Sequence, residues 1–289
     1  MHILITDSGV GGLSVVAYVE HFVRHHGVDE PVRLTFANAA PANDFGYNSM
    51  KTREEKLETF DRFLRSVMQR YAPDMIYVAC NTLSVLLPDT PYAREATIPI
   101  KGIVETGVDL LHDTLEADPQ SVAIVFGTQT TIDAGAYFRM LTVRGVAPSR
   151  IVSQACPGLA DTISEDREGT RTAAEIRKWV ATALDKLQHP DARIVAALAC
   201  THYGYRRELF EEAFADAGVT ATVVNPNEIA IADMFGPESE ALSRETTVEF
   251  VTRYPIPEAT IDALTFFLED ISPKTVAAMK RFIHVPDLF

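Results

Sequence analysis

The sequence is short of cysteine and of basic charge. It has three cysteines in 289 residues, Cys80, Cys156 and Cys200, and their odd number and wide spacing argue against a disulfide framework. We therefore expect free thiols and a reducing, cytoplasmic compartment. Lysine and arginine total 26 against 40 acidic residues, and the formal net charge is -14. Nucleic acid is not an expected partner, because its binding relies on basic contacts to phosphate.

Long hydrophobic runs are also absent. The longest apolar stretches, such as residues 194–200, are far shorter than the roughly 20 residues of a membrane-spanning helix, so we expect no membrane segment. The first seven residues lack the basic region and the cleavage site of a secretory signal, and we expect them to form a first core strand. With 47% hydrophobic and 23% charged residues, the chain has a globular composition. It is long enough to bury a full core without metal or disulfide staples.

Short β-branched runs alternate with segments of helical period along the chain. The expected strands lie near residues 2–6, 32–37, 74–79, 121–126, 149–154, 193–199 and 220–224. Amphipathic helices are expected over 52–70, 171–187 and 205–217. Strand and helix in repeated alternation are typical of a parallel sheet covered on both faces, so the predicted fold class is α/β. Proline-bearing breaks predict a domain boundary near 95–100, and a second boundary is expected just after Cys200.

Two of these strands are followed by the same short pattern, a cysteine and then two polar residues. Residues 75–79 run into Cys80, and residues 195–199 run into Cys200; two polar residues follow each cysteine. Ligands of parallel sheets bind beyond the carboxyl ends of strands, where the next helix begins. A helix N-terminus would lower a thiol pKa from about 8.5 toward neutrality, which suits proton transfer. The alternative is that each cysteine is a small buried hydrophobe that ends a core strand. Cys156, which precedes a proline, is interpreted as structural or adjacent to the site.

The polar residues after the two thiols are candidates for substrate contact. Asn81, Thr82 and Thr201 could donate hydrogen bonds to a substrate carboxylate and stabilise the charge that develops when an α-proton leaves. His202 could polarise the Cys200 thiol or shuttle its proton. The alternative interpretation is that Asn and Thr cap helices and that a single histidine has a structural role.

A third strand end carries Asp7 and Ser8, followed by glycines at positions 9, 11 and 12. A dinucleotide-binding turn is disfavoured, because the last glycine of that fingerprint would fall at Ser14 and no acidic residue ends the second strand. Asp7 and Ser8 instead offer an acceptor and a hydroxyl to a substrate ammonium or carboxylate. They could alternatively cap the helix expected over about 11–24.

These segments together resemble the aspartate/glutamate racemase superfamily, and among its members most closely glutamate racemase. The resemblance is carried, in the family's order and spacing, by Asp-Ser-Gly-Val-Gly-Gly-Leu-Ser at 7–14, Ala-Cys-Asn-Thr at 79–82 and Cys-Thr-His-Tyr at 200–203. Supporting stretches lie at 102–105, 126–131 and 155–157. The likeness spans most of the first 205 residues and is thin beyond them.

The resemblance implies two similar parallel-sheet α/β domains with the active site in the cleft between them. The first domain would be discontinuous, residues 1–98 plus 206–289, and the second would span 99–205. Cys80 and Cys200 would be the catalytic acid/base pair on opposite faces of the substrate α-carbon, with His202 and Asp7 as further catalytic residues. The implied substrate-binding residues are Asp7, Ser8, Phe45, Gly46, Asn81, Thr82, Thr201 and His202. No metal and no cofactor is expected.

The implied reaction is interconversion of L- and D-glutamate for peptidoglycan precursor supply. A matched thiol pair suits it, because inversion by proton transfer needs a base on one side of the carbon and an acid on the other. The only implied partner is a small amino acid, and a homodimer is left open. The family's Pro-Tyr-Gly element is replaced by a longer loop at 43–47, and its acidic residue after Cys-Pro is displaced, with Asp161, Glu165 and Asp166 nearest.

Three alternatives therefore stay open. The first is racemisation of aspartate or another amino acid. The second is decarboxylation or cis/trans isomerisation of a small diacid on the same scaffold. The third is a carboxylate-binding protein without turnover. The segment from about residue 250 onward is longer than usual for the family, and we expect it to cover a domain or a subunit interface.

Overall fold

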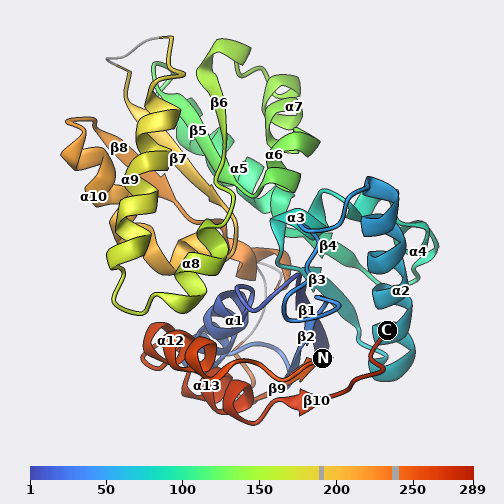
Figure 1. The fold of residues 1–289 in the computed structure, drawn as a ribbon. Coiled ribbons are helices and arrows are strands. Elements are labelled where there is room, and N and C mark those ends of the chain that lie inside the picture. Colours follow the sequence, from blue (N-terminus) through green and yellow to red (C-terminus); the bar gives the residue numbers. More distant parts are fainter. Residues whose placement is uncertain (189–191, 236–240) are drawn as a thin grey trace. The chain divides into compact units, whose positions relative to one another are not determined.

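The computed structural model describes residues 1–188, 192–235 and 241–289, which form two compact units (Figure 1). The first unit comprises Met1–Ile103 with Asn227–Phe289, and the second comprises Val104–Pro226. Each contains one sheet whose strand pairings are all parallel, with helices on both faces. The predicted α/β fold class is confirmed.

The sheet of the first unit has six strands in the order β10-β9-β2-β1-β3-β4. Their bounds are β1 (His2–Asp7), β2 (Val32–Asn38), β3 (Met75–Val78), β4 (Ile100–Gly102), β9 (Thr246–Thr252) and β10 (Ile283–His284). The central strand β1 pairs with β2 on one side and with β3 on the other, in registers that place Asp7 beside Asn38 and Thr6 beside Val78. The carboxyl ends of these three strands therefore meet at one edge.

The helices of this unit cover both faces of its sheet. Their bounds are α1 (Leu13–His26), α2 (Arg53–Tyr71), α3 (Asn81–Ser84), α4 (Pro91–Glu95), α11 (Pro226–Ile229), α12 (Glu258–Leu268) and α13 (Pro273–Lys280), with 3-10 turns at Leu87–Asp89 and Ala230–Asp233. Helices α1, α12 and α13 lie on one face, and α2 and α4 lie on the other (Figure 1). Thr52 starts α2 by accepting from the Glu55 N–H at 3.1 Å. The helix then buries Phe60, Phe63 and Leu64 at helical spacing.

The sheet of the second unit has four strands in the order β6-β5-β7-β8. Their bounds are β5 (Val122–Gly127), β6 (Ile151–Ala155), β7 (Ile194–Ala199) and β8 (Ala221–Val224). The helices are α5 (Ile103–Ala117), α6 (Gln129–Ala134), α7 (Ala136–Val143), α8 (Leu159–Glu165), α9 (Thr170–Leu184) and α10 (Arg207–Asp216), with 3-10 turns at Pro148–Arg150 and η3 (Tyr203–Arg206).

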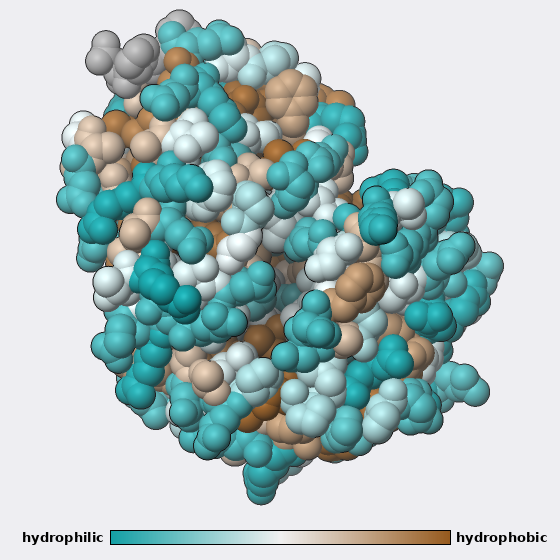
Figure 2. All heavy atoms as spheres, in the orientation of Figure 1, coloured by the Kyte–Doolittle hydropathy of each residue, from teal (hydrophilic) through white to brown (hydrophobic). Residues whose placement is uncertain are grey.

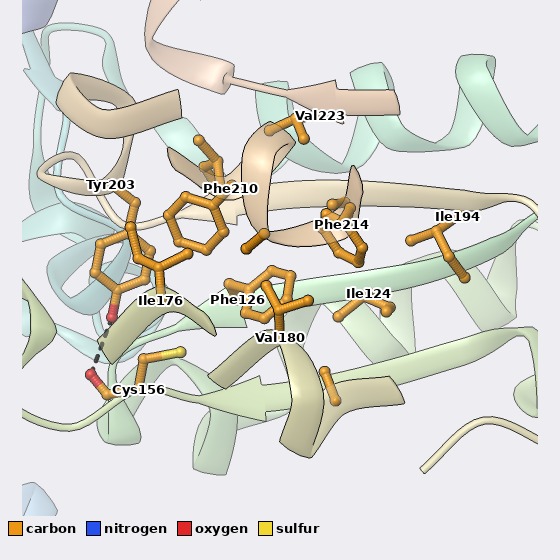
Figure 3. Packing of buried hydrophobic residues seen from close by; sticks show 14 of the residues in the cluster. Ile124, Phe126, Cys156, Ile176, Val180, Ile194, Tyr203, Phe210, Phe214 and Val223 are labelled. Carbon is orange, nitrogen blue, oxygen red and sulfur yellow. Dashed lines mark hydrogen bonds between the residues drawn. The ribbon is translucent and has the colours of Figure 1, made fainter. Parts of the chain in front are cut away.

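One face of this sheet packs a hydrophobic cluster against α8, α9 and α10 (Figure 3). Because side chains alternate along a strand, β5 contributes every second residue, Val122, Ile124 and Phe126, and β7 contributes its own alternate set. Cys200 belongs to the same cluster and continues the phase of β7. The Cys200 side chain therefore starts on the α8–α10 side of the sheet.

All seven strands expected from the sequence are present, within one or two residues at their ends. The strands β4, β9 and β10 were not predicted. Strand β9 pairs with β2, so the C-terminal segment builds part of the first unit's sheet. Its sequence, Thr-Thr-Val-Glu-Phe-Val-Thr, is rich in β-branched residues and carried the signal for a strand.

The face of the molecule in Figure 2 is mostly hydrophilic, with hydrophobic residues scattered over it. This agrees with a chain in which 23% of the residues are charged. Among the residues that the structure describes, no helix combines the length and the apolar composition needed to cross a membrane.

Candidate active-site groups

The Cys80 thiol lies two residues beyond β3, at the start of a single helical turn. Cys80 is the N-cap residue of α3, and its carbonyl oxygen accepts from the Ser84 N–H at 2.8 Å. The side chain is 5% exposed. Its Sγ lies 3.1 Å from the Ser8 hydroxyl, which comes from the end of the neighbouring strand β1. The structure therefore brings together Cys80 and Ser8, as the shared strand edge predicts.

Asp7 is the last residue of β1 and is buried beside Ser8. Its Oδ1 accepts from the Gly9 N–H at 3.1 Å, which folds the glycine-rich turn over the carboxylate. A Cβ on Gly12 would lie 2.8 Å from the Asp7 Cβ, so only glycine allows α1 to begin this close. Asp7 and Ser8 do not cap α1, because Gly12 is its N-cap residue and no side chain caps it.

Asn81 and Thr82 are the first residues of α3 and are almost fully buried. Neither caps the helix, because Cys80 holds the N-cap position. Phe45 and Gly46 lie in the loop between β2 and α2, where Phe45 bridges to Ala42 and is 39% exposed. Their role in substrate binding stays a prediction.

The electrostatics of Cys80 differ from the expectation. Burial, followed by the nearby carboxylate of Asp7, raises the pKa of the Cys80 thiol to about 12, while the hydrogen bond from Ser8 acts in the lowering direction. The expected lowering toward neutrality is wrong for this thiol. Helix α3 has only four residues, which is too short for a strong macrodipole. At neutral pH Cys80 is therefore a protonated thiol.

Substitutions of Asp7 and Ser8 are expected to change the reactivity of Cys80 in opposite directions. Asp7→Asn removes a negative charge and should lower the pKa of Cys80, so alkylation by iodoacetamide at pH 8 should be several-fold faster than in the wild type. Ser8→Ala removes a hydrogen-bond donor to the thiolate and should slow the same reaction. Alkylation rates against pH, read by peptide mass mapping, measure both. Shifts of equal sign in the two variants would contradict this account.

The Cys200 thiol occupies the matching place in the second unit. Cys200 follows β7 directly and is 5% exposed, and the Tyr203 N–H closes the next turn on its carbonyl oxygen at 3.0 Å. The Cys200 Sγ lies 4.0 Å from Nδ1 of His202, at the outer limit of a sulfur hydrogen bond. Thr201 between them is buried. The structure thus brings together Cys200 and His202, as their spacing predicts.

Cys156 differs from the other two cysteines. It is 2% exposed inside the hydrophobic cluster, and its Sγ lies 3.7 Å from the carbonyl oxygen of Gln154. Burial raises the pKa of this thiol above its ordinary value. These features are those of a structural cysteine.

The three acidic candidates after Cys156 have different environments. Asp166 accepts from the N–H of Thr172 at 2.8 Å and from its hydroxyl at 3.0 Å at the start of α9. Glu165 lies 3.7 Å from Arg171. Asp161 is exposed on the first turn of α8 and contributes to raising the pKa of Tyr203, which burial dominates. Asp161 is therefore the one of the three with an electrostatic link to the turn that follows Cys200.

Two tyrosines near the Cys80 group were missed at the sequence level. Tyr47 is fully buried, and burial, with a smaller contribution from the charge of Cys80, raises the pKa of its phenol. Tyr254 follows β9, and its hydroxyl accepts from Nδ2 of Asn38 at 3.0 Å, one strand away from Asp7. Tyr47 stood in the atypical 43–47 loop, and recognising β9 as a strand would have indicated Tyr254.

Helix α5 carries a separate cluster of polar side chains. His112, Asp113 and Glu116 have ligand-type atoms within 4.8 Å of one another. Both imidazole nitrogens lie near carboxylates, at 3.5 and 3.8 Å, and the two acidic residues are exposed. This is a polar cluster on the surface of α5, and it does not include Cys80, Cys200 or the residues beside them.

The chain is an α/β protein with two parallel-sheet units. Each unit has a buried thiol beside polar groups, just beyond the carboxyl end of a strand. No protein-family model matches the chain. The sequence is 28% identical over 211 residues to the glutamate racemase of Chlorobium phaeobacteroides, covering 72% of this chain and 70% of that protein.

Solved structures show a similar fold. The glutamate racemase of Campylobacter jejuni has a TM-score of 0.70 at 20% identity, covering 92% of this chain and 98% of that one. The glutamate racemase of Francisella tularensis, solved in complex with D-glutamate, has a TM-score of 0.69 at 20% identity, covering 92% and 93%. The predicted resemblance to the aspartate/glutamate racemase superfamily, and within it to glutamate racemase, is confirmed, and the chain has the glutamate racemase fold.

Proposed function

We propose that this chain is a cofactor-independent glutamate racemase that uses Cys80 and Cys200 as its acid/base pair. The observation that carries the proposal is the matched placement of the two thiols, each 5% exposed, at the carboxyl edge of its own parallel sheet. The similarity to glutamate racemases supports the same reaction. No metal or organic cofactor takes part in the proposed mechanism.

In the proposed mechanism the two thiols have complementary roles in proton transfer. One sulfur removes the α-proton as a thiolate, and the other returns a proton to the opposite face of the same carbon as a thiol. Because burial and Asp7 keep Cys80 protonated at neutral pH, Cys80 is the proton donor in the resting state of this mechanism. The reverse reaction needs the opposite protonation state. His202, 4.0 Å from Cys200, is placed to exchange the proton that resets the pair.

The remaining polar side chains hold the substrate in this proposal. Asn81 and Thr82 beside Cys80, and Thr201 beside Cys200, donate to the α-carboxylate and stabilise the carbanionic charge as the α-proton leaves. Asp7 and Ser8 bind the substrate ammonium. The distal carboxylate is the group that the 43–47 loop, with Phe45 and Gly46, contacts.

Glutamate is the proposed substrate, because the relatives bear the name glutamate racemase and one solved relative holds D-glutamate. The product, D-glutamate, would enter peptidoglycan precursor synthesis, which places the enzyme in the cytoplasm. The formal net charge of -14 disfavours a polymeric anion as the substrate.

Exchange of the α-proton with solvent tests this function. In deuterated buffer, the wild-type protein should replace the α-proton signal of L-glutamate while the optical rotation falls to zero. L-Aspartate and L-alanine in parallel give the substrate preference. Exchange with aspartate alone would transfer the proposal to aspartate. Release of carbon dioxide would contradict racemisation and favour the decarboxylase alternative. Glutamate binding in calorimetry without proton exchange would favour the carboxylate-binding alternative.

A further inference from the structure

The turn that carries Cys200 is held from inside the hydrophobic core. Tyr203, three residues on, closes this turn through its own N–H on the Cys200 carbonyl oxygen at 3.0 Å. Its side chain is 0% exposed and packs in the cluster, with its ring centroid 5.9 Å from that of Phe210 (Figure 3). The first residue of η3 is therefore anchored by both its main chain and its side chain.

The Tyr203 hydroxyl forms a bond that crosses the end of the sheet. It donates to the carbonyl oxygen of Cys156 at 3.2 Å, shown as the dashed line in Figure 3. Cys156 follows β6, whereas Tyr203 follows β7, and β5 lies between these two strands. The Cys156 N–H in turn donates to Gly127, the last residue of β5, at 2.9 Å. The bond thus braces the carboxyl ends of three strands together.

A second anchor holds the far end of η3. The Arg206 guanidinium is mostly buried and donates to the carbonyl oxygen of Asp166 at 2.8 Å, and also to that of Arg167. Arg206 lies six residues after the thiol, whereas the Tyr203 brace acts directly at the turn that begins with Cys200. The position of the sulfur therefore depends most closely on the Tyr203–Cys156 bond.

We propose that Tyr203 is a positioning residue for Cys200, and that it acts through the hydrogen bond from its hydroxyl to the main-chain carbonyl oxygen of Cys156. The proposal rests on the racemase function proposed above. A proton transfer to or from carbon needs the sulfur near the reacting atom in a narrow range of geometry, and a small misplacement lowers the rate steeply. Cys156 lies in the core, and its carbonyl oxygen accepts the hydrogen bond that fixes the turn beginning at Cys200.

The substitution Tyr203→Phe tests this proposal, because it keeps the ring packing and removes only the hydroxyl. We expect kcat to fall about tenfold with KM nearly unchanged. We also expect the kinetic isotope effect on kcat/KM with α-deuterated glutamate to rise for one enantiomer only, the one that Cys200 deprotonates. Alkylation of Cys200 by iodoacetamide should become several-fold faster, because the released turn exposes a residue that is only 5% exposed in the wild type.

The matched control is Tyr137→Phe, which removes another buried tyrosine hydroxyl from α7 of the same unit. This control should leave Cys200 alkylation and both isotope effects at wild-type values, and Cys80 should alkylate at the same rate in all three proteins. Equal Cys200 alkylation rates in folded wild type and Tyr203→Phe would overturn the proposal. Alkylation does not depend on turnover, so this readout decides the positioning role even if the protein racemises no amino acid.

Discussion

Cys200→Ala is expected to abolish racemisation of glutamate, with kcat/KM in both directions reduced by at least about 10³-fold. A positioned general acid or base contributes roughly 10²–10⁴-fold, and inversion cannot proceed when one face of the carbon lacks its proton-transfer group. The loss has to appear in both directions, because in the proposed mechanism each thiol acts as base for one enantiomer and as acid for the other. Circular dichroism of L- and D-glutamate solutions measures the two rates.

The remaining thiol gives this experiment a second readout. In deuterated buffer, the Cys200→Ala protein should exchange the α-proton of only one enantiomer, with retention of configuration, because Cys80 can still remove and return a proton on its own face. Cys80→Ala should exchange the other enantiomer. Cys156→Ala is the matched control, since this buried thiol is placed outside the mechanism, and it should keep exchange of both enantiomers. Full racemisation by either active-thiol variant would refute the two-base mechanism.

Phe126→Ala is expected to destabilise the second unit by about 3–5 kcal/mol, the cost of replacing a fully buried aromatic ring by alanine. Phe126 is 0% exposed on β5, with its ring centroid 5.2 Å from that of Phe210 and 6.2 Å from that of Phe214. On the sheet side its neighbours in the cluster include the cross-strand residue Leu198, whose main chain is held by the sheet. The cavity would therefore collapse only in part.

The fluorescence of Trp179 measures this loss. It is the single tryptophan of the chain, and it packs on the same cluster from α9, so its signal during urea unfolding reports on the second unit. A local probe is needed because two compact units need not unfold in one transition. Phe138→Ala on α7 is the control: that ring is 38% exposed, and its loss should change stability by less than about 0.5 kcal/mol. Equal unfolding midpoints for the two variants would contradict the assigned core.

Much of the architecture could be predicted because its signals are local. Each expected strand was a short β-branched run, and the position of Cys80 and Cys200 just beyond strand ends followed from the same pattern. The unpredicted strands have a physical explanation. Strands β4 and β10 have three and two residues, too few for a periodic signal. Strand β9 pairs with β2, more than 200 residues earlier in the chain.

The candidate site was also predicted only in part from the sequence. The sequence placed Asp7, Ser8 and Cys80 at one edge, because parallel strands end together, and the 3.1 Å contact between Ser8 and Cys80 agrees with that inference. It led to the wrong direction for the pKa shift of Cys80, because the local rule for helix N-termini ignores burial and the charge of Asp7. A pKa depends on everything near the group in space, whatever its place in the chain.

The amino-acid sequence by itself determined the α/β class, the strands that end in the two thiols and the resemblance to glutamate racemase, since periodicity and short motifs are properties of neighbouring residues. Only the tertiary structure decided that Cys80 is held as a protonated thiol and that Tyr203 bonds to the Cys156 carbonyl. Ser8 and Cys80 are 72 residues apart in the chain, and Cys156 and Tyr203 are 47 apart. Contacts across such separations form when the sheets bury these side chains together, and burial also sets their charge.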